Sequence, residues 1–220
     1  MVLPCIGTGR CFCDGRSAAP RSFGAVLIAS VAPRTWRKWL PLIALVLLAD
    51  ALGGWWYYVH RREHSQDAVI RAAAARYGVD AALVKAVVWR ESWFDPSALG
   101  KAGELGLMQI CPPAAHEWAA AEKLTNFHHE QLADPGSNTL CGTWYLAKLL
   151  RRYSATDDAV PFALADYNAG RGHVLRWNGG AAATNSAQFL AQMTFPGTRR
   201  YIETIRERRE KYRDEFAPPR

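Results

Sequence analysis

The sequence lacks an excess of charge of one sign over most of its length. Of the formal net charge of +7, residues 1–65 carry +5, because they hold eight Lys/Arg and three Asp/Glu. Residues 66–220 hold nineteen Lys/Arg and seventeen Asp/Glu, which leaves only +2. A protein that binds nucleic acid neutralises phosphates with a basic face. The near balance over residues 66–220 therefore argues against a nucleic-acid partner.

Cysteine is also scarce, and three of the five cysteines lie within the first 13 residues. Cys11-x-Cys13 is too short a motif to predict a zinc site. Cys111 and Cys141 are open to two interpretations: two small buried apolar side chains, or a disulfide of the kind that forms outside the cytoplasm. No spacing of His, Cys and carboxylate residues predicts a metal site, and we expect neither a metal nor a cofactor.

Strand signals and internal repeats are missing as well, because no run alternates between apolar and polar residues. The chain from residue 66 reads as helices joined by loops, with Gly78 expected to end the first helix and Asp80 to cap the second. The Gly-, Ser- and Pro-rich stretch 92–110 is expected to be mostly loop. These patterns predict one mainly α domain, with helices at 67–77, 81–91, about 113–123, about 136–153, 158–170, 172–177, 185–193 and 198–216. In the helix 136–153 we expect an apolar stripe that includes Leu140, Trp144, Leu146 and Leu150.

One long segment has almost no charge: Trp39 to Val59 holds 21 residues and only Asp50 is charged. About 20 apolar residues suffice for a helix to cross a bilayer. Arg34, Arg37 and Lys38 precede the segment, which favours an N-terminus in the cytoplasm. We therefore predict a single-pass membrane anchor, with residues 60–220 outside the cytoplasm.

A cleaved signal peptide is the alternative for this segment, since Ala49-x-Ala51 has the small residues that signal peptidase prefers. Both interpretations export residues 60–220. The predicted organisation is a disordered extension at 1–33, the membrane or signal segment at 34–60, a linker at 61–66 and the domain at 67–216.

A carboxylate interrupts the apolar stripe of the second helix. Val84, Val87 and Val88 follow the spacing of one buried helix face, and the next position on that face is Glu91. Burial and the carbonyl end of the helix both disfavour an ionised carboxylate there and raise its pKa. A carboxyl group that keeps its proton near neutral pH can act as a general acid in glycosidic cleavage. The competing interpretation is a core glutamate with an Arg, Lys or backbone partner.

The residues after Glu91 resemble the motifs of the soluble lytic transglycosylase family, whose members have a lysozyme-like fold and cut peptidoglycan. The matching residues are Glu91-Ser92, Phe94, Pro96 and the run Gly106-Leu107-Met108-Gln109-Ile110. Two further elements match, Tyr167-Asn168-Ala169-Gly170 and a C-terminal "FPGTRRYI" with Tyr201 at its aromatic position. The resemblance covers roughly residues 66–216. It departs from the family at Gly100, where many members have a serine.

The resemblance implies a reaction and a set of residue roles. Glu91 would be the catalytic acid and base that cleaves the β-1,4 bond between N-acetylmuramic acid and N-acetylglucosamine and closes a 1,6-anhydro ring. Tyr167 would donate a hydrogen bond to Glu91, and the residues expected to bind substrate are Ser92, Met108, Gln109, Tyr167, Asn168 and Tyr201. Asn168 and Met108 have plainer interpretations as a helix cap and a core residue. The expected partners are glycan strands of peptidoglycan and the inner membrane, and we expect a monomer.

Two other functions stay open on the sequence alone. A hydrolytic lysozyme needs a second carboxylate to activate water. Asp95, Glu104 and Asp166 are the candidates, of which Asp95 precedes Pro96 and fits a turn, while Asp166 should face away from Tyr167 around a helix. A non-catalytic glycan-binding module would favour replacement of the glutamate, but Glu91 is present.

Overall fold

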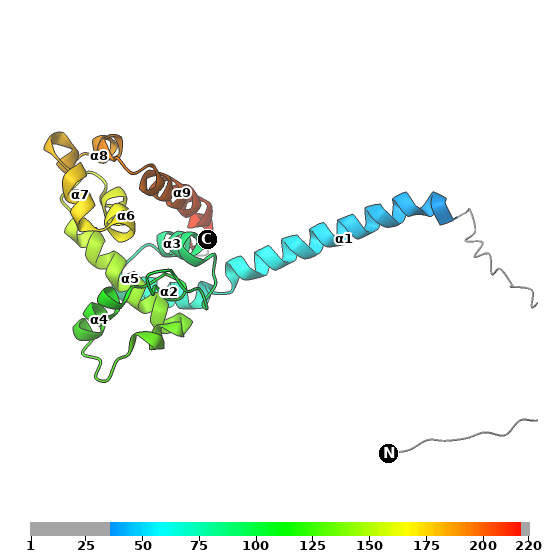
Figure 1. The fold of residues 1–220 in the computed structure, drawn as a ribbon, viewed down its shortest axis with the longest axis horizontal. Coiled ribbons are helices and arrows are strands. Elements are labelled where there is room, and N and C mark those ends of the chain that lie inside the picture. The colour runs from blue at the N-terminus through cyan, green and yellow to red at the C-terminus, as the bar shows by residue number, and fades with distance from the viewer. Residues whose placement is uncertain (1–35, 217–220) are drawn as a thin grey trace, which may run out of the picture. The chain divides into compact units, whose positions relative to one another are not determined.

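The computed structural model in Figure 1 describes residues 36–216, which form nine α-helices joined by loops and three 3-10 turns. Within this range only two isolated bridges have strand geometry, Leu99 with Leu105 and Leu105 with Ile110, so the predicted mainly α fold is confirmed. The predicted extension 1–33 lies outside the described residues. The helices are α1 Trp36–His64, α2 Asp67–Tyr77, α3 Ala81–Ser92, α4 Pro112–Ala121, α5 Pro135–Arg152, α6 Ala159–Ala169, α7 Arg171–Trp177, α8 Ser186–Gln192 and α9 Pro196–Arg213.

The turn between α2 and α3 forms as its residues predict. Gly78 ends α2 in the left-handed region at φ 65°, which only glycine enters without steric cost. Asp80 caps α3, because its side chain accepts a hydrogen bond from the backbone N–H of Ala82 at 2.9 Å. These local signals set where α3 begins, and therefore which of its residues reach the last turn.

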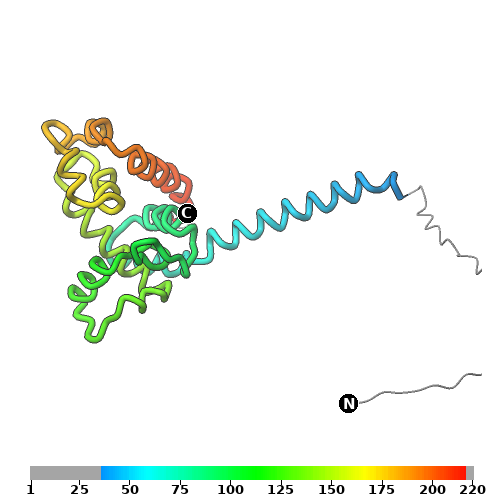
Figure 2. The backbone as a smooth tube through the Cα atoms, in the orientation of Figure 1, coloured from blue at the N-terminus to red at the C-terminus, as the bar shows by residue number. Residues whose placement is uncertain are grey.

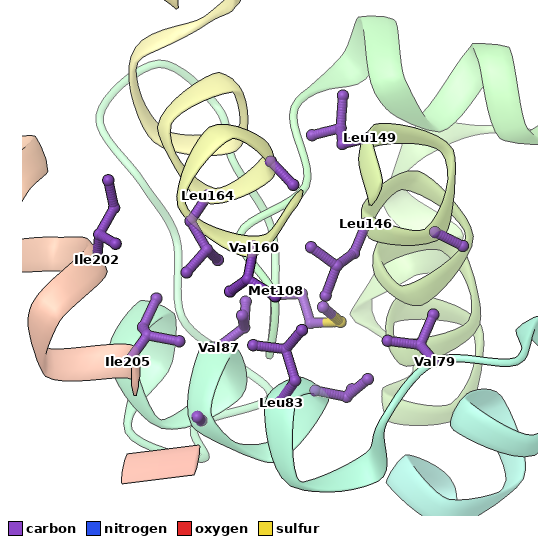
Figure 3. Packing of buried hydrophobic residues seen from close by; sticks show 14 of the residues in the cluster. Val79, Leu83, Val87, Met108, Leu146, Leu149, Val160, Leu164, Ile202 and Ile205 are labelled. Atoms are coloured by element: carbon purple, nitrogen blue, oxygen red, sulfur yellow. The ribbon is translucent and has the colours of Figure 1, made fainter. Parts of the chain in front are cut away.

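The core is built around α3. Every side chain from Ala82 to Val88 is buried, and α3 packs along α9, which returns to it from the far end of the chain (Figure 2). Figure 3 shows Leu83 and Val87 of α3 meeting Leu146 of α5 and Ile205 of α9. Burying one such aliphatic side chain contributes about 1.5–3 kcal/mol. The last turn of α3 is thereby held rigidly.

The buried face of α5 differs from the predicted stripe. Leu146 is fully buried, but Leu140, Trp144 and Leu150 are only partly buried. Small and polar residues make the deeper face instead: Asn138, Thr139, Cys141, Gly142 and Thr143. The reason is a close approach to the loop before α4, since a Cβ atom on Gly142 would collide with the side chain of Met108.

The predicted linker at 61–66 is wrong, because α1 stays helical as far as His64 and its last residues are fixed to the domain. Arg62 pairs with Asp95 at 3.3 Å, and Glu63 accepts hydrogen bonds from Tyr212, Arg208 and Lys211. The charged residues of 61–66 suggest a solvated linker from sequence alone, but here Arg62 and Glu63 pair with residues of the domain.

A buried ionic cluster completes this junction. His64 bonds to Asp67 at 2.9 Å, and the fully buried Lys85 pairs with Asp67 at 2.8 Å and Glu215 at 2.6 Å. Removing one partner from a buried pair typically costs about 3–5 kcal/mol. The cluster therefore ties the end of α1 to α2, α3 and the C-terminal turn.

One segment of the described residues, beginning at Trp36, is long and apolar enough to cross a membrane. Helix α1 has no buried residue, and its exposed side chains include Leu45, Leu47, Leu52 and Trp56. An exposed apolar surface of this extent is rare in water. The helix thus fits the length and composition of the predicted anchor.

Candidate active site

Glu91 lies in the last turn of α3 and is partly buried. The helix ends beyond it at Trp93, which adopts φ 51°, and Phe94 follows at φ 62° with 2% of its surface exposed. Left-handed backbone at two successive non-glycine residues is costly. Burial of Phe94 in the core helps hold this tight exit, which turns the chain away immediately after Glu91.

The hydrogen-bond partner of Glu91 is Tyr201, not Tyr167. The Tyr201 hydroxyl of α9 donates to Glu91 Oε1 at 2.5 Å, whereas the Tyr167 hydroxyl of α6 donates to the Met108 carbonyl at 2.7 Å. The prediction that Tyr167 bonds to Glu91 is therefore wrong. Oε1 accepts from Tyr201, so Oε2 is the carboxyl oxygen left free to carry a transferable proton.

Burial raises the pKa of Glu91, and the nearby negative charge of Glu104 acts in the same direction. The hydrogen bond from Tyr201 and the positive charge of Arg90 oppose this shift, but burial wins. The pKa values of Tyr167 and Tyr201 are raised well above 10, again mainly by burial, with the Glu91 charge as the next cause. Both phenols therefore stay protonated and act as donors.

The loop that faces Glu91 is held by hydrogen bonds to its backbone. Ser92 Oγ donates to the Leu107 carbonyl at 2.8 Å, and Asn138 Oδ1 accepts from the Met108 N–H at 2.9 Å. The Asn138 amide also donates to the carbonyls of Leu105 and Leu132. Ser92 and Asn138 thus position the loop, which for Ser92 differs from the predicted substrate contact.

Met108 is a core residue. Its side chain is fully buried against Gly142 and Thr143, so it offers no apolar surface to a ligand. The predicted substrate contact through this side chain is wrong, and the plainer interpretation holds. Only the backbone of Met108 belongs to the site, through its bonds to Asn138 and Tyr167.

A cavity of about 370 Å³ opens over Glu91. Its walls bring together four of the residues predicted to act in catalysis or substrate binding, Glu91, Gln109, Tyr167 and Asn168, with four others. The lining residues are Glu91, Gly100, Lys101, Glu104, Gln109, Cys111, Tyr167 and Asn168.

Gln109 and Asn168 both line this cavity, and their amide groups differ in what they already bind. The Gln109 amide donates to the carbonyls of Ala98 and Gly106, so its nitrogen is committed to the loop. Asn168 is exposed, and its Oδ1 accepts from the Thr198 hydroxyl at 2.9 Å, which leaves its amide N–H groups for a ligand.

The absence of a side chain at Gly100 makes room for Glu104. A Cβ atom at position 100 would collide with Glu104 Oε2, which accepts a hydrogen bond from the Ala102 N–H at 2.9 Å. The departure from the family serine at position 100 therefore coincides with a carboxylate turned into the cavity. From the sequence, Glu104 is only one of three candidates for a second carboxylate. No residue pattern near it indicates that its side chain fills the space beside Gly100.

The other two candidates for a second carboxylate are engaged elsewhere. Asp95 accepts hydrogen bonds from the N–H and hydroxyl of Ser97, as its turn position predicts. Asp166 is buried, does not line the cavity and pairs with Arg152 at 2.6 Å. Of the three predicted candidates, only Glu104 lines the cavity.

Cys111 and Cys141 are both free thiols in the structure, so the disulfide, one of the two interpretations of this pair, is not formed. Cys111 is exposed at the cavity wall, whereas Cys141 is buried in α5. Burial raises the pKa of Cys141 to about 12, so it behaves as a small apolar residue.

Residues able to hold a metal ion cluster away from this cavity. His64, Asp67 and Glu215 place ligand atoms within 4.8 Å of one another. The ammonium group of Lys85 pairs with both carboxylates, so a cation already neutralises the cluster.

The motifs, the helical frame and the cavity agree with one protein family. The family model for the transglycosylase SLT domain matches residues 68–190, more than half of the chain. The chain belongs to this family. The match includes Glu91, Asn138 and Tyr167, while Tyr201 lies beyond its end.

Two curated relatives of this transglycosylase family are similar in sequence. Membrane-bound lytic murein transglycosylase F of Desulfosudis oleivorans is 39% identical over 109 residues, which are 48% of this chain and 22% of that protein. Membrane-bound lytic murein transglycosylase C of Salmonella typhimurium is 34% identical over 125 residues, which are 54% of this chain and 35% of that protein. The chain therefore spans only about a fifth to a third of the length of these relatives.

Solved structures share the fold. The 70 kDa soluble lytic transglycosylase of Escherichia coli superposes with a TM-score of 0.61 at 26% identity, over 68% of this chain and 24% of that one. A complex of the 70 kDa soluble lytic transglycosylase with bulgecin A gives a TM-score of 0.64 at 25% identity, over 78% of this chain and 28% of that one. These matches confirm the lysozyme-like fold.

Because the Tyr167 hydroxyl bonds to the Met108 carbonyl and not to Glu91, mutation of Tyr167 is expected to affect mainly stability. Tyr167→Phe leaves the buried Met108 carbonyl without its donor, which costs about 1–3 kcal/mol. In a domain of this size we expect the melting temperature to fall by roughly 2–12 °C. Thermal unfolding of the full chain in a non-ionic detergent measures this.

Tyr145→Phe is the matched control, since the Tyr145 hydroxyl has no hydrogen bond among residues 36–216 and its ring lies 5.6 Å from that of Tyr167. An unchanged melting temperature together with a large loss of activity in Tyr167→Phe would return this residue to the role of a direct Glu91 partner.

Proposed function

We propose that this chain is a membrane-anchored lytic transglycosylase that cleaves the β-1,4 bond between N-acetylmuramic acid and N-acetylglucosamine in peptidoglycan. The observation that carries this is a single partly buried carboxyl group with a raised pKa, Glu91, which opens onto a cavity and accepts a hydrogen bond from Tyr201. The relatives named as lytic murein transglycosylases support the same substrate class. All the proposed site residues come from one chain, so a monomer suffices.

In the first step, Glu91 acts as the acid. Its raised pKa keeps a proton on Oε2, which transfers to the leaving glycosidic oxygen. The acetamido group of the substrate then supports the developing cation, so no second carboxylate is needed. Asn168 lies on the cavity wall with free amide donors for the sugar.

In the second step, Glu91 acts as the base. The carboxylate takes the proton of the O6 hydroxyl, whose oxygen closes the 1,6-anhydro ring. During this interval Glu91 is charged in a poorly solvated place, and the Tyr201 hydroxyl stabilises it. Tyr201 therefore contributes most to the ring-closing half of the reaction.

A hydrolytic muramidase is the second candidate, because Glu104 places another carboxylate in the cavity. In the lyase, Glu104→Gln should retain activity and 1,6-anhydro products. Loss of its negative charge lowers the pKa of Glu91, so the pH at which activity falls on the alkaline side should shift downward. In a hydrolase, the same variant loses its base and its activity.

The test measures muropeptide release from purified sacculi as a function of pH. Glu130→Gln is the control, since Glu130 is exposed and has no place in the cavity. An inactive but folded Glu104→Gln protein would favour the hydrolase, and an unshifted pH profile would remove Glu104 from any influence on Glu91.

For the anchor, we propose that residues 39–59 hold the chain in the inner membrane with the domain in the periplasm. The apolar run of α1, which has no buried residue, supports this. The full-length chain should sediment with membranes and resist extraction by alkaline carbonate. A soluble periplasmic product that begins at Leu52 would show instead that a signal peptide is cleaved after Ala51.

A further inference from the structure

The end of α1 is bonded directly to the loop that follows the catalytic helix α3. The Arg62 guanidinium donates to the Trp93 carbonyl at 2.7 Å and lies over the Trp93 ring at 4.4 Å. It also donates to the Tyr58 hydroxyl at 2.9 Å, and the rings of Tyr58 and Trp93 are 6.3 Å apart. Trp93 is thus held beside the aromatic residues that end the apolar run of α1.

Two hollows lie near this contact, one lined by Trp93 and the other by Arg62, and both contain arginine and aromatic side chains. The first, of about 440 Å³, is lined by Trp89, Arg90, Trp93, Arg200 and Thr204. The second, of about 380 Å³, includes Tyr58, Arg61, Arg62 and Ser65. Neither is the cavity over Glu91, and nothing in the proposed reaction uses them.

The arginines of these hollows are unevenly neutralised. Arg62 pairs with Asp95, but the ion pairs found among residues 36–216 include none with Arg61, Arg90 or Arg200. Arg61 and Arg200 are also exposed. Guanidinium groups match phosphate oxygens in geometry and charge, and Trp and Tyr favour the boundary between water and lipid.

The position of Arg62 along α1 determines which phosphate groups lie near its guanidinium. Arg62 follows Val59, the end of the apolar run, by three residues, which is about 4.5 Å along a helix. The headgroup layer on each side of a bilayer is roughly 5–7 Å deep. With residues 39–59 in the membrane, Arg62 and the residues bonded to it lie in this layer.

We propose that the juxtamembrane face, formed by Tyr58, Arg61, Arg62, Arg90, Trp93 and Arg200, binds the phosphodiester headgroups of anionic phospholipids in the leaflet that α1 enters. The inference rests on the proposed anchor. Because Trp93 directly follows the helix that carries Glu91, headgroup binding fixes the height and direction of the active-site cavity above the membrane.

The test uses the full chain in nanodiscs of equal parts phosphatidylglycerol and phosphatidylcholine. Native mass spectrometry measures the ratio of the two lipids that stay bound when the protein is released. In the double variant Arg61→Gln/Arg200→Gln, each hollow loses one arginine. Each arginine near an anionic surface is worth about a fivefold preference, so loss of two should lower the ratio by about 25-fold.

Arg151→Gln/Arg171→Gln is the matched control, because both arginines are exposed and line neither hollow. Its lipid ratio should equal that of the wild type. An unchanged ratio in the Arg61/Arg200 variant, or an equal fall in the control, would overturn the inference while leaving the anchor intact.

Two further outcomes also decide the matter. A chain that does not enter nanodiscs would overturn the anchor and this inference with it. An Arg61/Arg200 variant with an unchanged lipid ratio but weaker binding to purified sacculi would overturn the lipid assignment and make the first hollow a glycan subsite.

Discussion

Glu91→Gln should abolish muropeptide release, with a loss of about 10⁴-fold or more. One positioned general acid or base contributes roughly 10²–10⁴-fold, and Glu91 serves in both steps of the proposed reaction. Glutamine has nearly the same shape and can still accept the Tyr201 hydrogen bond, but it can neither give nor take a proton. The measurement is the rate of release from purified sacculi by the full chain in detergent.

The stability of this variant follows from the raised pKa of Glu91. The folded state favours the protonated carboxyl group. The contribution of Glu91 to the free energy of unfolding is therefore fully present below the ordinary pKa of 4.5 and is lost as pH rises through the raised pKa. Glutamine carries no charge at any pH. At neutral pH the variant should therefore unfold at the same or a slightly higher temperature, and retained activity in a folded Glu91→Gln protein would remove Glu91 from the catalytic role.

Tyr201→Phe should have the second largest effect, a loss of roughly 10- to 150-fold in turnover. A hydrogen bond to a charged group contributes about 1.5–3 kcal/mol, and 1.36 kcal/mol is tenfold in rate. The ring is kept, so the packing of the buried Tyr201 against α3 is kept as well. Single-turnover kinetics should show the larger delay in ring closure, when Glu91 is charged.

Tyr167→Phe is the control for this experiment, since its hydroxyl bonds to the Met108 carbonyl and not to Glu91. The two variants should separate: Tyr201→Phe loses rate with little change in stability, and Tyr167→Phe loses stability with a smaller change in rate. The reverse pattern would contradict the observed arrangement of the two tyrosines.

The sequence predicts what local chemistry determines. Gly78 and Asp80 place the ends of α2 and α3, and the apolar spacing of Val84, Val87 and Val88 points Glu91 toward the interior. The catalytic candidate and the loop that faces it therefore follow from patterns a few residues long.

Long-range partners do not follow from such patterns. Glu91 and Tyr201 are 110 residues apart, and a tyrosine in either of two matching motifs could supply the hydroxyl. The apolar pattern of the sequence does not predict the buried face of α5, because Asn138, Gly142 and Thr143 on that face are not apolar. These residues are buried because they pack against Met108 and its backbone. A polar residue at a buried helical position is the signal that identifies Glu91, and the same signal would have identified Asn138.

The most direct test of the central claim is the origin of the oxygen at the cleaved end. Purified sacculi are digested by the full chain in water enriched in heavy oxygen, and the muropeptides are weighed by mass spectrometry. A lytic transglycosylase consumes no water, so the products should carry no heavy oxygen and should each be lighter by one water than a hydrolytic product. Muropeptides with a labelled reducing-end muramic acid would contradict the account and assign the chain to the hydrolases.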